Sequence, residues 1–323
     1  MKIEDKIYGV EKINEKVLIE LINSKPIQRL KGISQWGLPN GYHFKNGFSR
    51  YEHSMGVFIL LRKLNASLEE QIGGLIHDIS HTAFSHVVDW VLGDPIKENY
   101  QDNIFEDFLK KSDIKKILDK YKLDYKKISK LENFCLLEKE APSLCADRID
   151  YCLRELILDN KKDYVQNIFL DLENKNNQIV FKNKEKAKIF AKEYQKMQRE
   201  HWAGDQARTR YYILSNVLKK ALNKNIINIS DLHQTDDYVL EKMHASQDNF
   251  ILENLNLLKG DLKIIQDKNG IELKKKFRYI DPEISVNSSY KKLSELSDEY
   301  KELIKLEKEK SQEINKIKYF LQK

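Results

Sequence analysis

Helical periodicity fills most of this chain, and it is the feature that most restricts the possible fold. Only five prolines and twelve glycines interrupt the 323 residues, and most long stretches repeat apolar residues at helical spacing. Two segments instead resemble β-hairpins, one over 167–181 and one over 262–276 with 267–270 (Asp-Lys-Asn-Gly) as its turn. From about residue 288 onward, charged heptad-like residues predict a terminal helix. The sequence therefore predicts a mostly α fold with small β-hairpins.

Two helix starts stand close together in the first quarter of the chain. Residues 49–52 (Ser-Arg-Tyr-Glu) form a capping box that places His53 in the first turn of a helix. Residues 67–70 (Ser-Leu-Glu-Glu) predict the next helix, which carries His77 and Asp78 near its C-terminal end. On an ideal helix these two side chains and His81 share one side. Imidazole and carboxylate groups behind an apolar run are costly unless a partner such as a divalent metal ion collects them.

A third predicted helix, starting at 142–143 (Pro-Ser), has two faces of different character. Its apolar stripe comprises Cys145, Ile149, Cys152 and Leu156, and its polar stripe comprises Asp147, Asp150, Tyr151 and Arg154. Asp147 can act as a metal ligand together with His53, His77 and Asp78 upstream. Two His and two Asp side chains suit Mn, Fe, Ni, Mg or Zn and leave positions open for water or phosphate. On the residues alone, an ordinary solvated helix face remains the alternative reading of the polar stripe.

Charge and cysteine content limit the classes of protein to which this chain can belong. The net charge of +6 permits attraction to phosphorylated ligands but is too small to indicate nucleic acid by itself. Lys-rich segments at 110–130 and 274–276 leave nucleic acid as a weakly supported partner, since such runs are typical of solvated helix faces. Three cysteines without a CxxC pair indicate reduced thiols in a reducing compartment. The N-terminus lacks a signal-peptide pattern, and no run approaches the roughly 20 apolar residues needed to cross a bilayer. We therefore expect a cytoplasmic protein with no membrane partner.

Five motifs occur in an order and at spacings that resemble a known family. They are residues 27–30 (Ile-Gln-Arg-Leu), 33–37 (Ile-Ser-Gln-Trp-Gly), 50–57 (Arg-Tyr-Glu-His-Ser-Met-Gly-Val), 77–86 (His-Asp-Ile-Ser-His-Thr-Ala-Phe-Ser-His) and 146–151 (Ala-Asp-Arg-Ile-Asp-Tyr). Together they resemble the HD-domain metal-dependent phosphohydrolase superfamily, and within it the deoxynucleoside triphosphate triphosphohydrolase branch. The resemblance covers residues 3–160 well and continues weakly to about 245. It implies an HD-domain helical bundle that forms a homo-oligomer.

The resemblance also implies roles for individual residues. The ligands of one divalent metal ion would be His53, His77, Asp78 and Asp147. The catalytic group would comprise Asp78, His81 as proton donor or base, and His86 as a second histidine beside the phosphate. The substrate contacts would be Arg50 on phosphate, Gln35 and Tyr151 at the sugar, and Asp150 as a pocket-wall or supporting residue.

Several positions depart from the pattern of the branch. A His-Glu pair commonly follows the position of His86, but residues 98–102 (Glu-Asn-Tyr-Gln-Asp) contain no histidine. Glu155 replaces an aspartate often found near the sugar 3′-hydroxyl, Trp36 replaces an aliphatic residue, and residues 201–206 do not repeat the phosphate-contacting pattern of the branch. The metal is therefore predicted more firmly than the substrate.

The predicted function is a metal-dependent phosphohydrolase that acts on nucleotides, converting a deoxynucleoside triphosphate to deoxynucleoside and triphosphate. The alternatives are a nucleotide phosphatase or phosphodiesterase acting on another phosphoester, and a catalytically weak HD protein that senses nucleotides or binds nucleic acid. Three segments are expected: 1–160 as the metal-binding catalytic core, 161–245 as its helical continuation with a β-hairpin, and 246–323 as a C-terminal helical extension with a small hairpin and a terminal helix.

Overall fold

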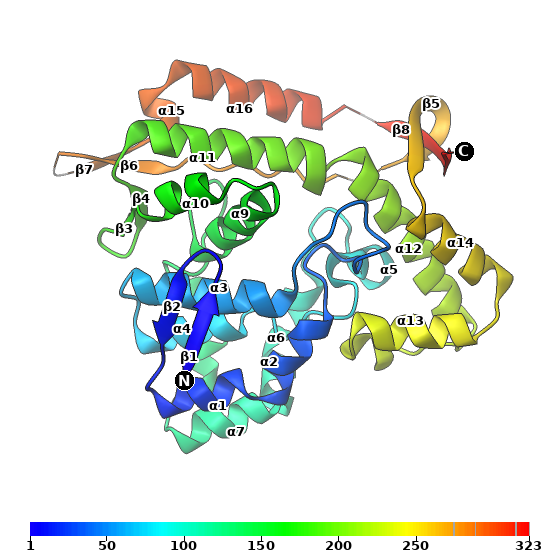
Figure 1. Cartoon of the computed structure of the whole chain (residues 1–323), viewed down its shortest axis with the longest axis horizontal. Coiled ribbons are helices and arrows are strands. Elements are labelled where there is room, and N and C mark those ends of the chain that lie inside the picture. Colours follow the sequence, from blue (N-terminus) through cyan, green and yellow to red (C-terminus); the bar gives the residue numbers. More distant parts are fainter. Residues whose placement is uncertain (274, 288, 314, 323) are drawn as a thin grey trace.

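Helices dominate the structure, as the sequence predicts. The computed structural model describes residues 1–273, 275–287, 289–313 and 315–322, so position 274 of the Lys-rich segment 274–276 lies outside the described residues. Within the described residues, three small sheets lie at the edges of a helical body (Figure 1). No described helix is both long enough and apolar enough to cross a membrane.

The elements follow one another from many short helices to a mixed C-terminal region. The α-helices are α1 (Lys16–Ile22), α2 (Lys25–Arg29), α3 (Arg50–Lys63), α4 (Leu68–Ile76), α5 (Asp89–Leu92), α6 (Tyr100–Lys111), α7 (Asp113–Lys120), α8 (Tyr125–Ile128), α9 (Ala146–Leu158), α10 (Lys162–Phe169), α11 (Lys184–Met197), α12 (Asp205–Asn223), α13 (Asp236–Ala245), α14 (Asn249–Lys259), α15 (Leu293–Leu296) and α16 (Asp298–Ser311). The strands are β1 (Lys2–Asp5), β2 (Gly9–Lys12), β3 (Leu172–Asn174), β4 (Ile179–Phe181), β5 (Leu262–Glu272), β6 (Glu283–Val286), β7 (Ser289–Lys292) and β8 (Lys316–Leu321). The shorter turns are η1 (Leu30–Gly32), η2 (Ser85–Val87), η3 (Leu131–Asn133), η5 (Asp231–His233) and the π-helical η4 (Gln198–Trp202).

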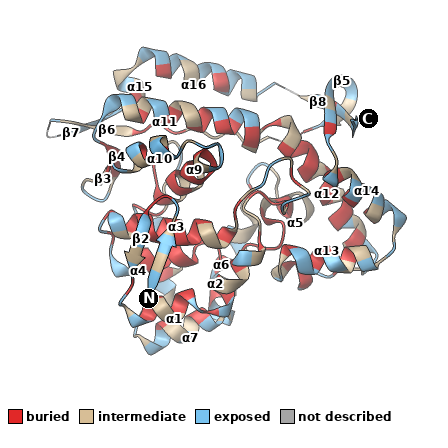
Figure 2. Ribbon diagram, viewed as in Figure 1, coloured by how far each residue is buried: buried red, intermediate tan, exposed pale blue. Residues whose placement is uncertain are grey.

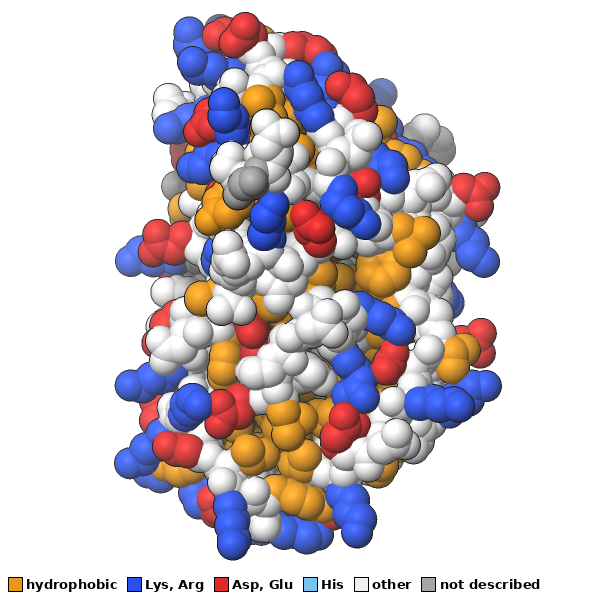
Figure 3. All heavy atoms as spheres, turned by 90° about the vertical axis from the view of Figure 1, so that its left-hand side faces the viewer, with side chains coloured by type: hydrophobic (Ala, Val, Ile, Leu, Met, Phe, Trp, Pro, Cys, Tyr) orange, Lys and Arg blue, Asp and Glu red, His pale blue; other side chains and the backbone are white. Residues whose placement is uncertain are grey.

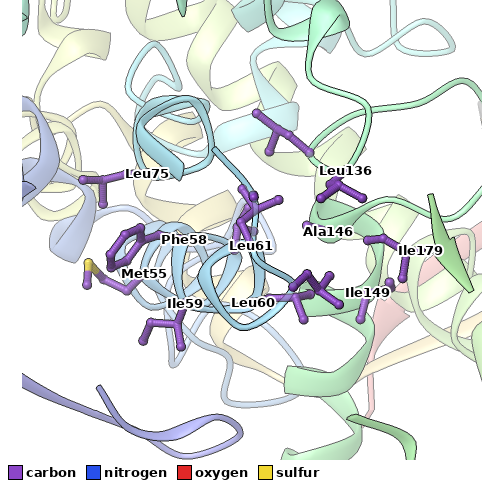
Figure 4. Close-up of a cluster of buried hydrophobic side chains, with 14 of the residues drawn as sticks. Met55, Phe58, Ile59, Leu60, Leu61, Leu75, Leu136, Ala146, Ile149 and Ile179 are labelled. Carbon is purple, nitrogen blue, oxygen red and sulfur yellow. The ribbon is translucent and has the colours of Figure 1, made fainter. Parts of the chain in front are cut away.

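Helix α3 lies at the centre of the main hydrophobic core. Its residues 53–61 are all buried (Figure 2), and it packs against α4 and α9. Figure 4 shows Phe58 and Leu61 of α3 in one cluster of buried hydrophobic side chains with Leu75 of α4 and Ile149 of α9. The core cluster runs from Ile7 to Tyr300, so it draws side chains from all three segments expected from the sequence. The boundaries near 160 and 245 stay a prediction.

Both predicted helix starts near the N-terminus are present. At α3, the Oγ atom of Ser49 accepts from the Glu52 N–H at 3.2 Å, and the Glu52 carboxylate accepts from the Ser49 N–H at 2.9 Å, which completes the capping box. At α4, Ser67 accepts from the N–H of Glu70, but the Glu70 carboxylate accepts from the N–H of Leu136 at 2.7 Å instead. The second cap therefore ties α4 to the loop that precedes α9.

Two helix boundaries differ from those expected. Helix α4 ends at Ile76, because the Nδ1 atom of His77 donates to the Gly74 carbonyl at 2.7 Å and residues 77–80 continue as turns. Helix α9 begins at Ala146 instead of 142–143. The carbonyl of Pro142 accepts from the N–H of Asp281, so this stretch makes contacts with a distant segment and not within a helix.

The β predictions were partly wrong. The first hairpin forms over β3 and β4, but residues 167–169 belong to α10. Strand β5 does not fold back on itself: it pairs along its length with β8, and residues 267–270 bulge out because Gln266 and Ile271 both lie opposite Ile317. The terminal helix α16 ends at Ser311, which lets the chain return as β8. Strands β6 and β7 form an unpredicted hairpin that joins β4 in a four-stranded sheet.

The C-terminal region lies along α11. Helices α11 and α16 run side by side (Figure 1), and Lys188 and Lys192 of α11 form ion pairs with Glu299 of α16. The face that contains the end of this layer carries Lys and Arg side chains interspersed with Asp and Glu (Figure 3). On that face, positive charge is not gathered into one patch.

Candidate metal centre and active site

Three helix ends bring His53, His77 and Asp147 to one point. The Nε2 atom of His53, from the first turn of α3, lies 3.2 Å from Nε2 of His77, which caps the C-terminus of α4. The same Nε2 atom lies 2.9 Å from Oδ1 of Asp147 in the first turn of α9. One ligand atom from each of these three side chains lies within 4.8 Å of the other two. The spacing is suited to a shared cation.

Asp78 completes the set of four side chains predicted to bind metal. Its Oδ1 atom lies 3.5 Å from Nε2 of His77, and its Oδ2 atom lies 3.9 Å from Nε2 of His53. The Arg50 guanidinium donates to Oδ2 of Asp78 at 2.9 Å, and Arg50 and Asp78 are both 3% exposed. A buried arginine therefore fixes the orientation of this carboxylate.

The ring orientations of both histidines are fixed by hydrogen bonds on the far side of each ring. Nδ1 of His77 donates to the Gly74 carbonyl, and Nδ1 of His53 donates to Oδ2 of Asp150 at 2.8 Å. When Nδ1 carries the proton, Nε2 of a neutral imidazole keeps its lone pair, which is the form that ligates a metal. Both Nε2 atoms face the centre of the cluster. The donor set therefore fits a divalent cation with nitrogen and oxygen ligands.

Charge at the centre also favours a cation. Burial alone would lower the pKa of His77, but the carboxylates of Asp78 and Asp147 raise it to about 9. The two carboxylates thus draw positive charge onto the histidines when no metal is bound. A second cluster, comprising Glu138, Cys145 and Asp147, is similarly compact. There the Arg148 guanidinium already donates to Cys145 and Glu138, so a protein cation fills that position.

Asp150 lies behind the metal centre and is absent from the side chains that line the cavity. Besides His53, it accepts from the Tyr8 hydroxyl at 2.9 Å and from Nε of Arg154 at 2.8 Å. Arg154 in turn donates to Asp5 at 2.7 Å. The N-terminal segment that carries the β1–β2 hairpin therefore supports the carboxylate that orients His53. The sequence left open whether Asp150 lines the pocket or supports a residue that does. In the structure Asp150 supports His53 from behind.

His81 and His86 stand beside the metal centre. Nε2 of His81 lies 3.3 Å from Oδ1 of Asp78, and the His81 and His86 rings are 5.0 Å apart. Burial holds the pKa of His81 well below its usual range, and the positive charge of the neighbouring Arg50 adds a smaller effect in the same direction. Nδ1 of His86 lies 3.1 Å from Oδ2 of Asp89, which orients this second ring. The structure therefore brings both predicted catalytic histidines to the predicted ligands.

A cavity of about 940 Å³ opens at the metal centre. Its lining includes these predicted site residues: Gln35, Arg50, His77, Asp78, His81, His86, Asp147 and Tyr151. The Gln35 carboxamide oxygen is buried and has no hydrogen-bond partner among the described residues. The Tyr151 hydroxyl bonds to that of Tyr194. Both predicted sugar-contacting residues thus lie on the cavity wall, and contact with a sugar remains a prediction.

One wall of the cavity is aromatic and surrounds a buried carboxylate. Glu155 accepts from the indole N–H groups of Trp36 at 3.0 Å and Trp202 at 2.5 Å, and its other oxygen lies 2.6 Å from Nδ1 of His201. The π-helical turn at the end of α11 directs His201 and Trp202 to this wall, and π-helical turns often mark functional sites. Nε2 of His43 is buried here without a partner in the described part of the chain. Sequence reasoning missed His43 and Tyr194, because no motif contains them. It compared residues 201–206 with a motif of the branch but gave Trp202 no role.

The chain matches a family model and several known proteins. The model for the HD domain matches residues 50–154. Uncharacterized protein YdhJ of Bacillus subtilis is 37% identical over 312 residues, which cover 94% of each chain. Metal-dependent phosphohydrolase cns2 of Cordyceps militaris is 42% identical over 155 residues, covering 48% of this chain and 45% of that protein. Deoxynucleoside triphosphate triphosphohydrolase SAMHD1 of Homo sapiens is 32% identical over 145 residues, covering 38% of this chain and 23% of that protein.

A solved structure shares the whole fold. The crystal structure of a phosphohydrolase from Bacteroides thetaiotaomicron covers 100% of this chain with a TM-score of 0.69, at 17% sequence identity, and 99% of that chain is matched. At this level of identity the likeness concerns the fold alone. Together with the matched HD domain and the relatives found by sequence, it confirms the resemblance to the HD-domain superfamily drawn from the motifs. This chain belongs to the HD-domain superfamily of metal-dependent phosphohydrolases.

Proposed function

We propose that this chain hydrolyses deoxynucleoside triphosphates to deoxynucleoside and triphosphate. The observation that carries the proposal is the connection between the metal centre and a cavity of about 940 Å³. That volume is at the upper end of the roughly 300–1,000 Å³ typical of small-molecule sites, which suits a ligand as large as a nucleoside triphosphate. The part-length similarity to proteins named deoxynucleoside triphosphate triphosphohydrolase supports the same substrate.

The residues at the centre can divide the work of phosphoester hydrolysis. A divalent cation held by His53, His77, Asp78 and Asp147 would neutralise phosphoryl charge and acidify a water molecule. In the proposed reaction, oxygen from water bonds to the α-phosphorus while the bond from that phosphorus to the sugar 5′-oxygen breaks. The neutral His81 ring accepts the proton that leaves the water and passes it to the 5′-oxygen of the departing sugar.

Charged side chains near the phosphate would hold it in place. Arg50 lies between Asp78 and Ser85, to which it donates at 2.9 and 3.0 Å, so its guanidinium is fixed at the cavity wall. His86 lies beside His81 and is oriented by Asp89. A fixed guanidinium and an oriented imidazole would stabilise the negative charge that builds up on the phosphoryl oxygens. They could do so without moving during the reaction.

A second candidate is a phosphatase or phosphodiesterase that acts on another nucleotide phosphoester. The observation that favours it is Glu155, both of whose oxygens are engaged by Trp36, Trp202 and His201. A carboxylate with three nitrogen donors has less capacity to accept from a sugar hydroxyl. In this second candidate the substrate would meet the aromatic rings of Trp36, Trp202 and His201 at this wall, and not the Glu155 carboxylate.

Metal analysis of the purified chain, followed by a screen of divalent ions and nucleotides, tests the proposal. Tripolyphosphate and deoxynucleoside as joint products would support it, whereas orthophosphate as the only phosphate product would favour the second candidate. Asp78→Ala should abolish both metal retention and turnover. Wild-type protein that binds nucleotides but hydrolyses none with any divalent ion would favour the nucleotide-sensing alternative. The expected homo-oligomer is tested on the same preparation by light scattering after size-exclusion chromatography.

A further inference from the structure

A segment from the C-terminal region crosses the wall of the catalytic cavity. Residues 275–279, here called the strap, lie in the connection between β5 and β6 in sequence. In space they run alongside α11 (Figure 1). Gln198, at the end of α11, donates to the Lys276 carbonyl at 2.6 Å, and Gln195 donates to the Arg278 carbonyl at 3.4 Å. Residues 276–279 of the strap line the cavity. A region remote in sequence from the HD motifs therefore supplies part of the candidate active site.

The strap gathers cations around one buried carboxylate. Glu98 accepts from Nη1 of Arg208 at 2.9 Å and from Nη2 of Arg278, while Nζ of Lys276 lies 4.0 Å away. Glu98 is 4% exposed, and Arg208 is 2% exposed. The side chains of Lys276 and Arg278 are 35% and 23% exposed, so their charged groups remain open to the cavity while they share the single negative charge of Glu98. Besides Glu98, the carboxylates of Asp102 and Asp89 also act electrostatically on Lys276 and oppose the lowering of its pKa by burial.

Those two acids have partners of their own. Asp89 accepts from the Tyr100 N–H at 2.9 Å and lies 3.1 Å from Nδ1 of His86. Asp102 accepts from the side chain of Gln101. They reduce the positive potential around Lys276 but do not cap its ammonium group, which donates to the Lys97 carbonyl at 2.7 Å. An ammonium group has three donors, so Lys276 keeps the capacity to bind an anion in the cavity.

The backbone conformation of Glu98 is strained, which is typical of residues at ligand-binding sites. Its φ angle is +52°, in the left-handed region that is unfavourable for residues other than glycine. Such conformations persist when surrounding contacts hold them, and they gather at ligand sites. Here the Glu98 carboxylate is held by Arg208 of α12 and by the strap, so the strained residue positions both cations at the cavity wall.

We propose that Arg208, Lys276 and Arg278 form a subsite for the terminal phosphates of a polyphosphate substrate, with Glu98 as the group that positions them. This subsite rests on the proposed function for its substrate and identifies which part of the cavity takes the phosphates remote from the metal. The same cavity is lined by Glu98, Arg208, Lys276 and Arg278 and by three of the four predicted metal ligands, His77, Asp78 and Asp147. Two guanidinium groups and an ammonium group match the several oxygens of a phosphate chain.

Binding of inorganic tripolyphosphate and orthophosphate to the full chain tests the subsite. Calorimetry on chelator-treated protein prevents the probe from removing a bound metal ion. Wild-type protein should bind tripolyphosphate more tightly than orthophosphate. The double variant Lys276→Met/Arg278→Gln should lose about 100-fold in tripolyphosphate affinity, because it removes two charged contacts worth about tenfold each. The single variant Lys276→Met, which leaves the Arg278–Glu98 pair intact, should lose about tenfold and guards against misfolding of the double variant.

Lys275→Ala is the matched control on the same strap. Its ammonium group pairs with Asp205 at 2.7 Å and is not among the cavity-lining residues. This variant should bind tripolyphosphate as the wild type does. Unchanged binding by both Lys276→Met and the double variant, or an equal loss in Lys275→Ala, would overturn the proposed subsite. Strap-dependent tripolyphosphate binding by a metal-loaded chain that hydrolyses no nucleotide would instead reject the proposed function and leave the subsite standing.

Discussion

Asp150 holds the ring of His53 in place through a hydrogen bond of 2.8 Å between Nδ1 and Oδ2, and both side chains are completely buried. Asp150 is itself held by Tyr8 and Arg154. The bond directs Nε2 of His53 toward His77 and Asp147. The orientation of a predicted metal ligand therefore depends on a carboxylate that lies outside the cavity.

Replacing this carboxylate should weaken metal binding. Asp150→Asn keeps the size of the side chain but removes the charge that raises the basicity of the His53 ring. Loss of such a supporting partner typically lowers metal affinity by about 10–100-fold, and we expect a change in this range. Competition with a chromophoric chelator gives the dissociation constant, and elemental analysis gives the metal content.

Asp159→Asn serves as the control for that substitution. Asp159 caps the C-terminus of the same helix, α9, and its Lys45 partner is exposed. Metal affinity should not change in this variant. Equal metal affinity in Asp150→Asn and the wild type would show that the hydrogen bond to His53 does not support the ligand.

Gly56 on α3 should resist replacement by any larger residue. A Cβ atom at this position would lie 1.9 Å from Nη2 of Arg154 and 2.0 Å from Oδ1 of Asp150. Gly56→Ala should lower the free energy of unfolding by about 1–3 kcal/mol, the usual cost of overpacking, despite the better helix propensity of alanine. Urea denaturation gives that free energy. The Gly56→Ala substitution should also reduce the metal content of the protein, because the displaced Asp150–Arg154 pair supports His53.

Ser54→Ala tests whether the helix tolerates change at a neighbouring buried position. The Ser54 hydroxyl is buried and has no hydrogen-bond partner among the described residues. Its removal should leave stability within about 1 kcal/mol of the wild type, since no hydrogen bond is lost. A Gly56→Ala variant as stable as Ser54→Ala would contradict the steric argument.

The four predicted metal ligands come together in the structure, and the sequence could anticipate this because each lies in a local motif close to a helix end. The capping box at Ser49 fixes where α3 begins, and the ordered motifs supply His77, Asp78 and Asp147. The role of Asp150 could not be separated from that of its polar neighbours, because helical periodicity places all of them on one face. Only the packing of α9 against α3 directs Asp150 behind His53.

Contacts that are distant in sequence explain most of what prediction missed. The turn-like residues 267–270 form a bulge because β5 pairs with β8, some 50 residues later, and nothing in β5 encodes that partner. Lys276 and Arg278 belong to a coil without periodicity, so only the folded chain brings them to Glu98. The π-helical turn that aims Trp202 at Glu155 likewise leaves no mark on a 3.6-residue repeat.

Metal binding should stabilise the folded chain. Binding to the native state alone adds about 2.7 kcal/mol when free metal is 100 times the dissociation constant. The melting temperature should therefore rise by several degrees when the activating ion is added to chelator-treated protein. Asp147→Ala should abolish that rise, because Asp147 supplies one of the converging ligand atoms. A rise of the same size in Asp147→Ala would place the stabilising ion at another site.

Glu155 should contribute strongly to stability through its three nitrogen donors. Both of its oxygens accept hydrogen bonds from Trp36, Trp202 and His201, and the residue is 4% exposed. Glu155→Gln removes the charge that strengthens these three hydrogen bonds and makes the His201 ring change tautomer to accept from the new amide, at a cost of about 1–3 kcal/mol. The free energy of unfolding in urea should fall by this amount, whereas Glu241→Gln on the exposed face of α13 should leave it unchanged. Wild-type stability in Glu155→Gln would mean that the aromatic wall holds its shape without the carboxylate.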